Sequence, residues 1–195
     1  MAALEVETTR LHGVLVLRYP VHRDSRGYFV RVLDQQLLAE HAGIDSTGFV
    51  QESQSRSTQG VLRGLHGRRH LSEAKLVRCA AGQIHDVIVD MRPSSPTFKQ
   101  SQAFVLDDVG HLQLYIPPGF AHGFQVLSDV ADIHYRMDAP YAPELDYAVR
   151  FDDPDLGIEW PLAPVGLSPR DVDALTFSAV APKLAGWYED LRECR

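Results

Sequence analysis

The sequence is poor in cysteine, in long apolar runs and in positive charge. Its two cysteines are Cys79, in an apolar segment, and Cys194, near the C-terminal end, which excludes a disulfide framework and fits a reducing compartment. No segment approaches the ~20 apolar residues of a membrane-spanning helix, and the acidic N-terminal residues do not form a secretory signal. A net charge of −7 argues against a nucleic-acid-binding surface. We therefore expect a cytoplasmic protein without membrane or nucleic-acid partners.

The composition is typical of a globular protein whose core is built from strands. Hydrophobic residues make up 45 % and charged residues 23 % of the 195 residues, and this length suits one core, so we expect a single domain over residues 1–195. Short segments rich in branched apolar residues recur at close spacing between Gly, Pro, Ser or Asp. This pattern predicts an all-β sandwich or barrel. The expected strands span residues 13–19, 28–32, 49–57, 61–66, 75–80, 83–91, 101–107, 112–116, 122–127 and 131–137.

Helices are expected only at the periphery and at the C-terminal end. Asp34 can cap a short helix over residues 35–41, which Gly43 would end. The tail from about residue 168 to residue 195 should be helical. It begins with a helical turn at 168–171 and finishes with a helix over residues 184–192.

The alternation of side chains along two strands predicts polar residues inside the protein. In the segment 131–137, Tyr135 shares a face with Ala131 and Ile133, so it should point to the interior. In the segment 83–91, Asp86 shares a face with two isoleucines. A carboxylate in that position lies either at the open end of the strand or in a polar pocket.

Two segments that end in histidine are the main candidates for a functional site. The first, Gly60–His66, is a short apolar strand containing Arg63, and Lys75 follows His66 by nine residues. The second, Pro117–His122, resembles the second cupin motif, in which proline and glycine shape a turn and the histidine projects into a barrel. A lone histidine at a strand end is more often a rim residue than a catalyst. Likewise, a Pro-Gly hairpin is often followed by a surface histidine.

The residues expected near His66 favour a catalytic role over that of a rim residue. Lys75 begins the next strand, which can return to His66 through one loop, and Tyr135 points inward from another strand. A base, a cation and a phenol are what enolisation requires: proton abstraction, stabilisation of charge on oxygen, and proton return. We therefore predict that His66 removes a proton from the carbon next to a ketone.

A metal site is the first alternative. Metal-binding cupins supply a His-x-His pair and a glutamate, which suit a divalent transition metal. Here the corresponding region offers His66, His70 and Lys75, and a lysine ammonium has no lone pair to donate. His66, His85 and His122 would form a site only if the fold brought them together. We expect neither a metal nor a cofactor.

Asp171 and Arg26 each have a simple structural explanation. Asp171 occupies the third helical position after Ser168 and Pro169, which is a capping box. Arg26 lies in a turn formed by residues 24–27. Arg26 and Arg63 would suit a diphosphate only if both faced one pocket.

Taken together, these segments resemble the dTDP-4-dehydrorhamnose 3,5-epimerase family of cupin-fold enzymes, over residues of about 10 to 178. The most specific matches are Leu-Arg-Gly-Leu-His at 62–66 and Pro-Pro-Gly-Phe-Ala-His-Gly-Phe at 117–124. The resemblance implies a double-stranded β-helix, or jelly-roll barrel, with short peripheral helices. Further matches are Asp-Ser-Arg-Gly-Tyr-Phe at 24–29, Ala-Lys-Leu-Val at 74–77, Asp-Val-Ile-Val-Asp at 86–90, Ser-Pro-Thr-Phe at 95–98 and Ile-Glu-Trp-Pro at 158–161.

The resemblance also implies a metal-free mechanism. His66 would be the base that takes the proton from C3 or C5, oriented by Asp171. Lys75 would hold the enolate oxygen at C4, Tyr135 would return a proton on the opposite face, and Asp86 would lie near Lys75.

Substrate binding and assembly are implied in the same way. The substrate would be a nucleotide-linked 4-keto-6-deoxyhexose, with dTDP as the expected nucleotide. The family forms homodimers that exchange an N-terminal strand, so Arg26 would serve the partner's site. Arg26, Arg63 and His122 would hold the diphosphate and the sugar, and the remaining substrate-binding positions would be Phe29, Gln51, Ser53 and Tyr141.

Four residues depart from the family pattern near the expected substrate pocket. Arg31 replaces Glu, Ser53 replaces Asn, Gly67 replaces an aromatic residue and Lys99 replaces Gly. The loss of the aromatic side chain at Gly67 would widen the pocket beside the base. These departures leave two further hypotheses open. One is an enzyme of secondary metabolism that inverts only one carbon, with an altered nucleotide preference. The other is a non-catalytic cupin that binds sugar nucleotides.

Overall fold

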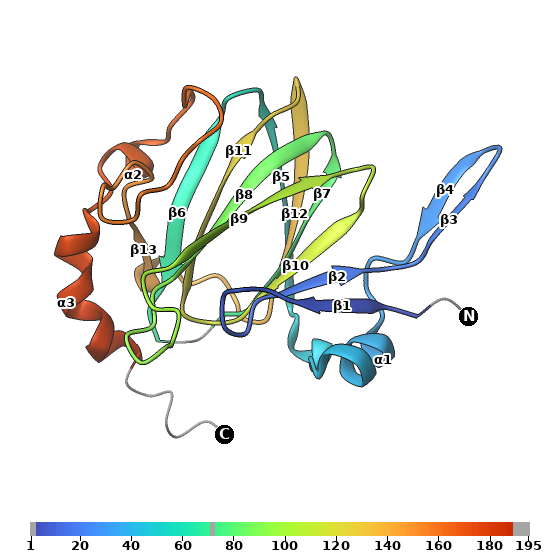
Figure 1. Ribbon diagram of the computed structural model, residues 1–195, viewed down its shortest axis with the longest axis horizontal. Helices are drawn as coiled ribbons and strands as arrows, with labels where there is room; N and C mark the ends of the chain where they lie inside the picture. The colour runs from blue at the N-terminus through green and yellow to red at the C-terminus, as the bar shows by residue number, and fades with distance from the viewer. Residues whose placement is uncertain (1–2, 71–72, 189–195) are drawn as a thin grey trace.

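Two antiparallel sheets make up most of the computed structural model, which describes residues 3–70 and 73–188 (Figure 1). One has six strands in the order β1–β2–β10–β7–β12–β5, and the other has five in the order β13–β6–β11–β8–β9. The strands are β1 Glu5–Thr8, β2 Leu15–Arg18, β5 Gln51–Thr58, β6 Leu62–Arg68, β7 Lys75–Ala81, β8 Gln83–Asp90, β9 Ser101–Asp107, β10 Leu112–Ile116, β11 Phe120–Val126, β12 Val130–Met137 and β13 Asp146–Ala148.

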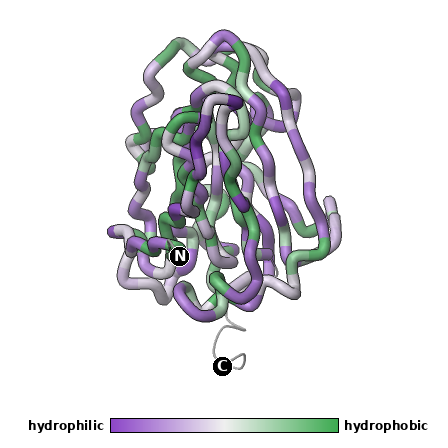
Figure 2. The backbone as a smooth tube through the Cα atoms, turned by 90° about the vertical axis from the view of Figure 1, so that its right-hand side faces the viewer, coloured by the Kyte–Doolittle hydropathy of each residue, from purple (hydrophilic) through white to green (hydrophobic). Residues whose placement is uncertain are grey.

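The expected all-β jelly roll is confirmed, and its core lies between the two sheets. Hydrophobic and hydrophilic residues alternate along the strands (Figure 2), and the inward faces of both sheets form one apolar cluster. Tyr135 packs against this cluster and Asp86 is fully buried beside it, as the alternation predicted. Cys79 is also part of it, and burial raises the pKa of its thiol to about 12; Cys194 lies outside the described residues.

All ten expected strands are present, and three short ones were not predicted. β1 and β13 each pair with a single neighbour at a sheet edge, and their sequences carry too few branched apolar residues to stand out. The third, β3 (Val21–Asp24), pairs with β4 (Gly27–Val30) across the expected turn to form a hairpin. The hairpin extends away from both sheets, at the right of Figure 1. Its Phe29 side chain is 64 % exposed.

The helices are short except for the last one. α1 (Gln35–Leu37) is capped by Asp34 and continues as the π-helix η1 (Leu38–Ala42), which ends at Gly43 as predicted. Single turns form at η2 (Ser46–Gly48), η3 (Pro143–Leu145) and α2 (Pro169–Val172). None of the helices in the described residues combines the length and apolar character needed to span a membrane.

The C-terminal helix α3 (Phe177–Tyr188) begins seven residues before the predicted start at residue 184. Pro182 inside it lowers the helix propensity of the sequence. The helix forms because Phe177, Val180 and Leu184, spaced by three and four residues, pack on the outer face of the five-stranded sheet. The predicted residues 189–192 lie outside the described residues.

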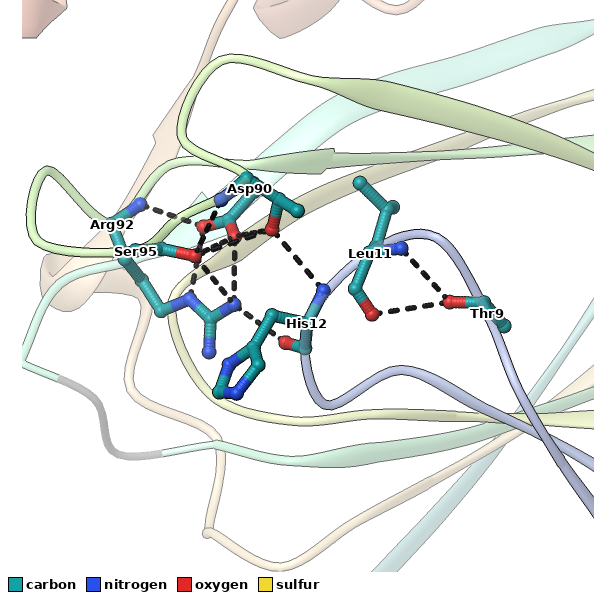
Figure 3. Close-up of polar contacts among 7 residues, drawn as sticks. Thr9, Leu11, His12, Asp90, Arg92 and Ser95 are labelled. Carbon is teal, nitrogen blue, oxygen red and sulfur yellow. Dashed lines mark hydrogen bonds and ion pairs between the residues drawn. The ribbon is translucent and has the colours of Figure 1, made fainter.

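A buried carboxylate fastens the N-terminal loop to the barrel (Figure 3). Asp90, at the end of β8, accepts hydrogen bonds from Arg92, Ser95 and Thr97. Arg92 also donates to the carbonyl oxygen of His12, and the amide of His12 donates to Thr97. The loop between β1 and β2 is thereby held against the connection from β8 to β9.

Two glycines allow close contact between the strands that carry the histidine motifs. A Cβ atom on Gly64 would lie 2.6 Å from the Cα atom of Gly123, and Gly64 has a positive φ of 125°. The register of β6 against β11 shifts at this point and places His66 opposite His122. The glycines of both motifs therefore position the two histidine-bearing strands.

Candidate active site

His66 and Asp171 form a dyad between the five-stranded sheet and α2. His66 lies near the end of β6, and its Nε2 atom is 2.6 Å from Oδ1 of Asp171 on α2. The second carboxylate oxygen of Asp171 accepts a hydrogen bond from the Ser168 hydroxyl in the expected capping box. The capping carboxylate is therefore also the partner of His66.

The charge of Asp171 fixes the protonation pattern of His66. Burial raises the pKa of Asp171, but hydrogen bonds from His66 and Ser168 outweigh this effect, and the pKa lies below its ordinary value. The carboxyl group is thus ionised at neutral pH and only accepts hydrogen bonds. Nε2 of His66 must therefore donate to it, and whenever the ring is neutral Nδ1 carries the free lone pair.

Tyr135 faces His66 from the opposite sheet as a protonated phenol. Its hydroxyl group lies 3.0 Å from the Ser55 hydroxyl, and its ring packs near those of His122 and Phe124. Burial raises the pKa of Tyr135 well above its usual range. At neutral pH this side chain can give a proton but carries no charge.

Lys75 begins β7 and pairs with Glu73, which was not among the predicted site residues. The distance from Nζ of Lys75 to Oε1 of Glu73 is 3.1 Å, and the other carboxylate oxygen of Glu73 accepts a hydrogen bond from the buried Arg68. The two-residue spacing of Glu73 and Lys75 was the available sequence signal, because such residues share a face in an extended chain. The expected neighbour of Lys75, Asp86, instead pairs with His122.

One pocket with a volume of about 230 Å³ joins these groups. His66, Lys75 and Tyr135 line it together with the predicted substrate-binding residues Gln51, Ser53 and Tyr141. An imidazole, an ammonium group and a phenol thus meet in one hollow, an arrangement suited to removing a proton next to a carbonyl group and returning it. Gly67, which was expected beside the base, also lines the pocket, and the lining residues that were not predicted are Glu73, Met137, Asp146 and Arg170.

His122, Asp86 and Arg63 lie just beyond this lining. Nε2 of His122 is 2.7 Å from Oδ2 of Asp86, and both side chains are buried. Arg63 donates to the Ser57 hydroxyl and is close enough to Tyr135 to affect its pKa. His122 lies on β11 and Asp86 on the neighbouring β8, whereas Arg63 is exposed on β6.

Arg26 and Phe29 are not brought to this pocket within one chain. Both lie on the projecting β3–β4 hairpin, where Arg26 pairs with Asp24. Within one chain Arg26 therefore does not meet Arg63, because the hairpin pairs only with itself, and its expected place in the partner's site stays a prediction.

Each of the three histidines considered together as metal ligands has a different side-chain partner. His66 pairs with Asp171, His122 pairs with Asp86, and the His85 ring packs edge-on against Trp160. Within residues 3–70 and 73–188, no three His, Cys, Asp or Glu side chains are grouped as a metal site.

Comparison with known proteins places the chain in a family. A sequence model described as dTDP-4-dehydrorhamnose 3,5-epimerase matches residues 8–179. The chain belongs to this family. A curated dTDP-4-dehydrorhamnose 3,5-epimerase of Methanothermobacter thermautotrophicus is 41 % identical over 162 residues, which cover 83 % of this chain and 86 % of the relative.

Two solved structures of the family illustrate its range. The Legionella pneumophila enzyme in complex with dTDP-4-keto-L-rhamnose superposes with a TM-score of 0.88 at 38 % identity, covering 93 % of this chain and 96 % of that one. A double mutant of ChmJ, a 3'-monoepimerase from Streptomyces bikiniensis, in complex with dTDP, also has a TM-score of 0.88. Its identity is 29 %, and the match covers 95 % of this chain and 94 % of that one.

Two of the four departures from the epimerase pattern do not line the pocket. Arg31 forms an ion pair with Asp34 at the base of the hairpin. Lys99 has a positive φ of 65°, which explains a glycine at this position in relatives. Its ammonium group contacts Asp155 and the ring of Phe177, at the start of α3.

The expectation that Gly67 widens the pocket is wrong. A Cβ atom at this position would lie 2.3 Å from Cζ of Tyr147, so the phenol ring already fills the space of a side chain. The Tyr147 hydroxyl is 2.8 Å from that of Tyr188 on α3. Tyr147 thus takes up the space that a side chain at position 67 would need.

Proposed function

We propose that this chain is an isomerase that epimerises a dTDP-linked 4-keto-6-deoxyhexose at C3, C5 or both. The observation that carries the proposal is the meeting of His66, Lys75 and Tyr135 in one pocket of an epimerase-family fold. Both carbons are adjacent to the C4 ketone, so removal of either proton gives a stabilised enolate.

In the proposed mechanism, Nδ1 of His66 takes the proton from the carbon, and the electron pair moves into the C4 carbonyl group. Asp171 stabilises the imidazolium that forms. The ammonium group of Lys75 holds the enolate oxygen, where negative charge develops only during the reaction. The enolate then takes a proton from the Tyr135 hydroxyl on the opposite face, which inverts the carbon.

The remaining predicted residues would bind the substrate. Arg63 and His122 would hold the diphosphate and sugar, and Gln51, Ser53 and Tyr141 would contact the nucleotide at the pocket mouth. A pocket of about 230 Å³ is smaller than the roughly 300–1,000 Å³ typical of sites for drug-sized ligands. A nucleotide sugar would therefore need further walls.

A second copy of the chain is proposed to supply those walls. The β3–β4 hairpin projects from the body with Arg26 and Phe29 exposed. In a homodimer with exchanged hairpins, both residues would complete the partner's pocket, with the arginine near the diphosphate and the aromatic ring near the base.

Solvent exchange tests the proposed reaction directly. The enzyme is incubated in D2O with dTDP-4-keto-6-deoxyglucose, and deuterium at C3 and C5 is followed by NMR. We expect deuterium at one or both carbons. Binding of the nucleotide sugar without deuterium at either carbon would refute the proposal and support the non-catalytic alternative.

Inversion at a single carbon is the second candidate, favoured by the close structural match to a 3'-monoepimerase. It predicts deuterium and inverted configuration at one carbon, whereas the double epimerase gives both. The product NMR spectrum distinguishes the two candidates.

Replacing Tyr135 with phenylalanine should separate proton removal from inversion. Without the phenol, His66 still abstracts and returns a proton on one face, so deuterium exchange continues. Formation of the inverted product should fall by roughly 10²–10⁴-fold. Equal losses of exchange and inversion would assign the proton return to another group. Tyr115→Phe, on the other face of the six-stranded sheet, is the control.

Mixing two inactive variants should restore activity if the hairpins are exchanged. In a heterodimer of Arg26→Ala and His66→Ala chains, one pocket would carry both substitutions, while the other would be wild type. Each heterodimer should therefore regain up to half of the activity of a wild-type dimer, so the activity of the mixture should rise with the fraction of heterodimer. Failure to regain activity, with heterodimers demonstrated by native mass spectrometry, would place Arg26 in its own chain's site.

A further inference from the structure

Glu73 links the pocket lysine to a second cation behind it. Oε1 of Glu73 is 3.1 Å from Nζ of Lys75, and Oε2 accepts a hydrogen bond from Nη1 of Arg68. The side chains are 22 %, 11 % and 7 % exposed for Lys75, Glu73 and Arg68 respectively. Lys75, Glu73 and Arg68 therefore form a row of charged side chains whose exposure decreases from the pocket toward the protein interior.

Arg68 is a fixed anchor for this carboxylate. Its Nη2 atom donates to the carbonyl oxygen of Pro140, and its own carbonyl oxygen accepts a hydrogen bond from Tyr188 on α3. The backbone next to Glu73 is also held, because the amide of Ala74 donates to Asp138 over 2.6 Å. One oxygen of Glu73 is thus immobilised, which leaves the other directed at Lys75.

We propose that Glu73 is a positioning residue for the epimerase reaction: it aims the ammonium group of Lys75 at the enolate oxygen. This inference rests on the proposed function. A lysine carries its charge on a flexible four-carbon stem, so without a partner the ammonium group would sample many positions. An ammonium group held in place before the reaction stabilises the developing charge without reorganisation.

The charge balance of the triad agrees with this role. A carboxylate beside an oxyanion site would oppose catalysis if Lys75 alone neutralised it. Here Arg68 supplies a second positive charge to the same carboxylate, so the group of three keeps one net positive charge. Glu73 can therefore orient Lys75 while the pocket still attracts the enolate.

A double-mutant cycle on the full-length enzyme tests the role of Glu73. The variants are Glu73→Gln, Lys75→Met and the combination, each measured by steady-state kinetics and by deuterium exchange with dTDP-4-keto-6-deoxyglucose. We expect Glu73→Gln to lower kcat by up to about 10²-fold, the cost of a misplacement of about 1 Å, with little change in KM, because the oxygen that Lys75 holds becomes charged only in the transition state. In the Lys75→Met background the same substitution should have no further effect.

Controls separate this role from a structural one and from failure of the proposed function. Glu144→Gln removes the same charge at an exposed position and should leave kcat unchanged, and dTDP binding and Tm report whether each variant is folded. A Glu73→Gln enzyme with wild-type kcat overturns the inference, and so does an equal loss in both backgrounds. If the wild-type enzyme shows no exchange, the proposed function fails before Glu73 is tested.

Discussion

A His66→Ala enzyme should bind its nucleotide sugar and fail to exchange deuterium at C3 or C5. Within the dyad, the His66 ring is the group that can accept a proton from carbon, because both carboxylate oxygens of Asp171 accept hydrogen bonds from His66 and Ser168. Loss of a positioned general base costs roughly 10²–10⁴ in rate. The exchange rate measured by NMR should fall by at least that range.

Two control measurements make this result decisive. His41→Ala, at an exposed position on η1, should exchange at the wild-type rate. dTDP binding should survive in the His66→Ala enzyme, because the predicted nucleotide contacts lie elsewhere in the pocket. Substantial exchange by a folded His66→Ala enzyme would transfer the role of base to another residue and remove the proposed mechanism.

The fold was predictable because the signals that specify it are local. Branched apolar residues with period-two alternation marked ten strands, and the same alternation placed Tyr135 and Asp86 on the inward faces. The capping box at Ser168 and Asp171 was equally visible. What the chain order did not show is that this cap lies against His66, 105 residues earlier.

The parts of the site that could not be predicted depend on pairing between distant segments. Glu73 belongs to the site because its carboxylate pairs with Arg68 and Lys75, and Tyr147 reaches Gly67 because β13 pairs with β6. The position of Arg26 depends on a hairpin that contacts neither sheet through strand pairing. Its proposed site lies on a second chain, which was expected from the resemblance to the epimerase family and from no pattern of residue spacing.

The largest loss of stability among these variants is expected for Asp90→Asn. Asp90 is fully buried and accepts hydrogen bonds from Arg92, Ser95 and Thr97. Removing its charge leaves the guanidinium group of Arg92 buried without its counterion, which costs about 3–5 kcal/mol of unfolding free energy. Urea denaturation measures this loss. Asp152→Asn, which breaks an Arg–Asp pair of the same two-residue spacing at an exposed site, should cost only about 0–1 kcal/mol.

The pH dependence of the stability difference between wild type and Asp90→Asn identifies the origin of the loss. Burial raises the pKa of Asp90, but hydrogen bonds from Arg92, Ser95 and Thr97 outweigh burial and hold it below 3.8. Because the pKa is lower in the folded than in the unfolded protein, the charge stabilises the fold fully above about pH 5, and this stabilisation is lost as the pH falls through the folded value. The difference between wild type and Asp90→Asn should therefore be constant from pH 8 to pH 5 and shrink below about pH 4. If the stability difference between wild type and Asp90→Asn instead stays constant down to the acid transition, the loss comes from poorer packing of the amide side chain. In that case the carboxylate charge does not hold the loop at His12.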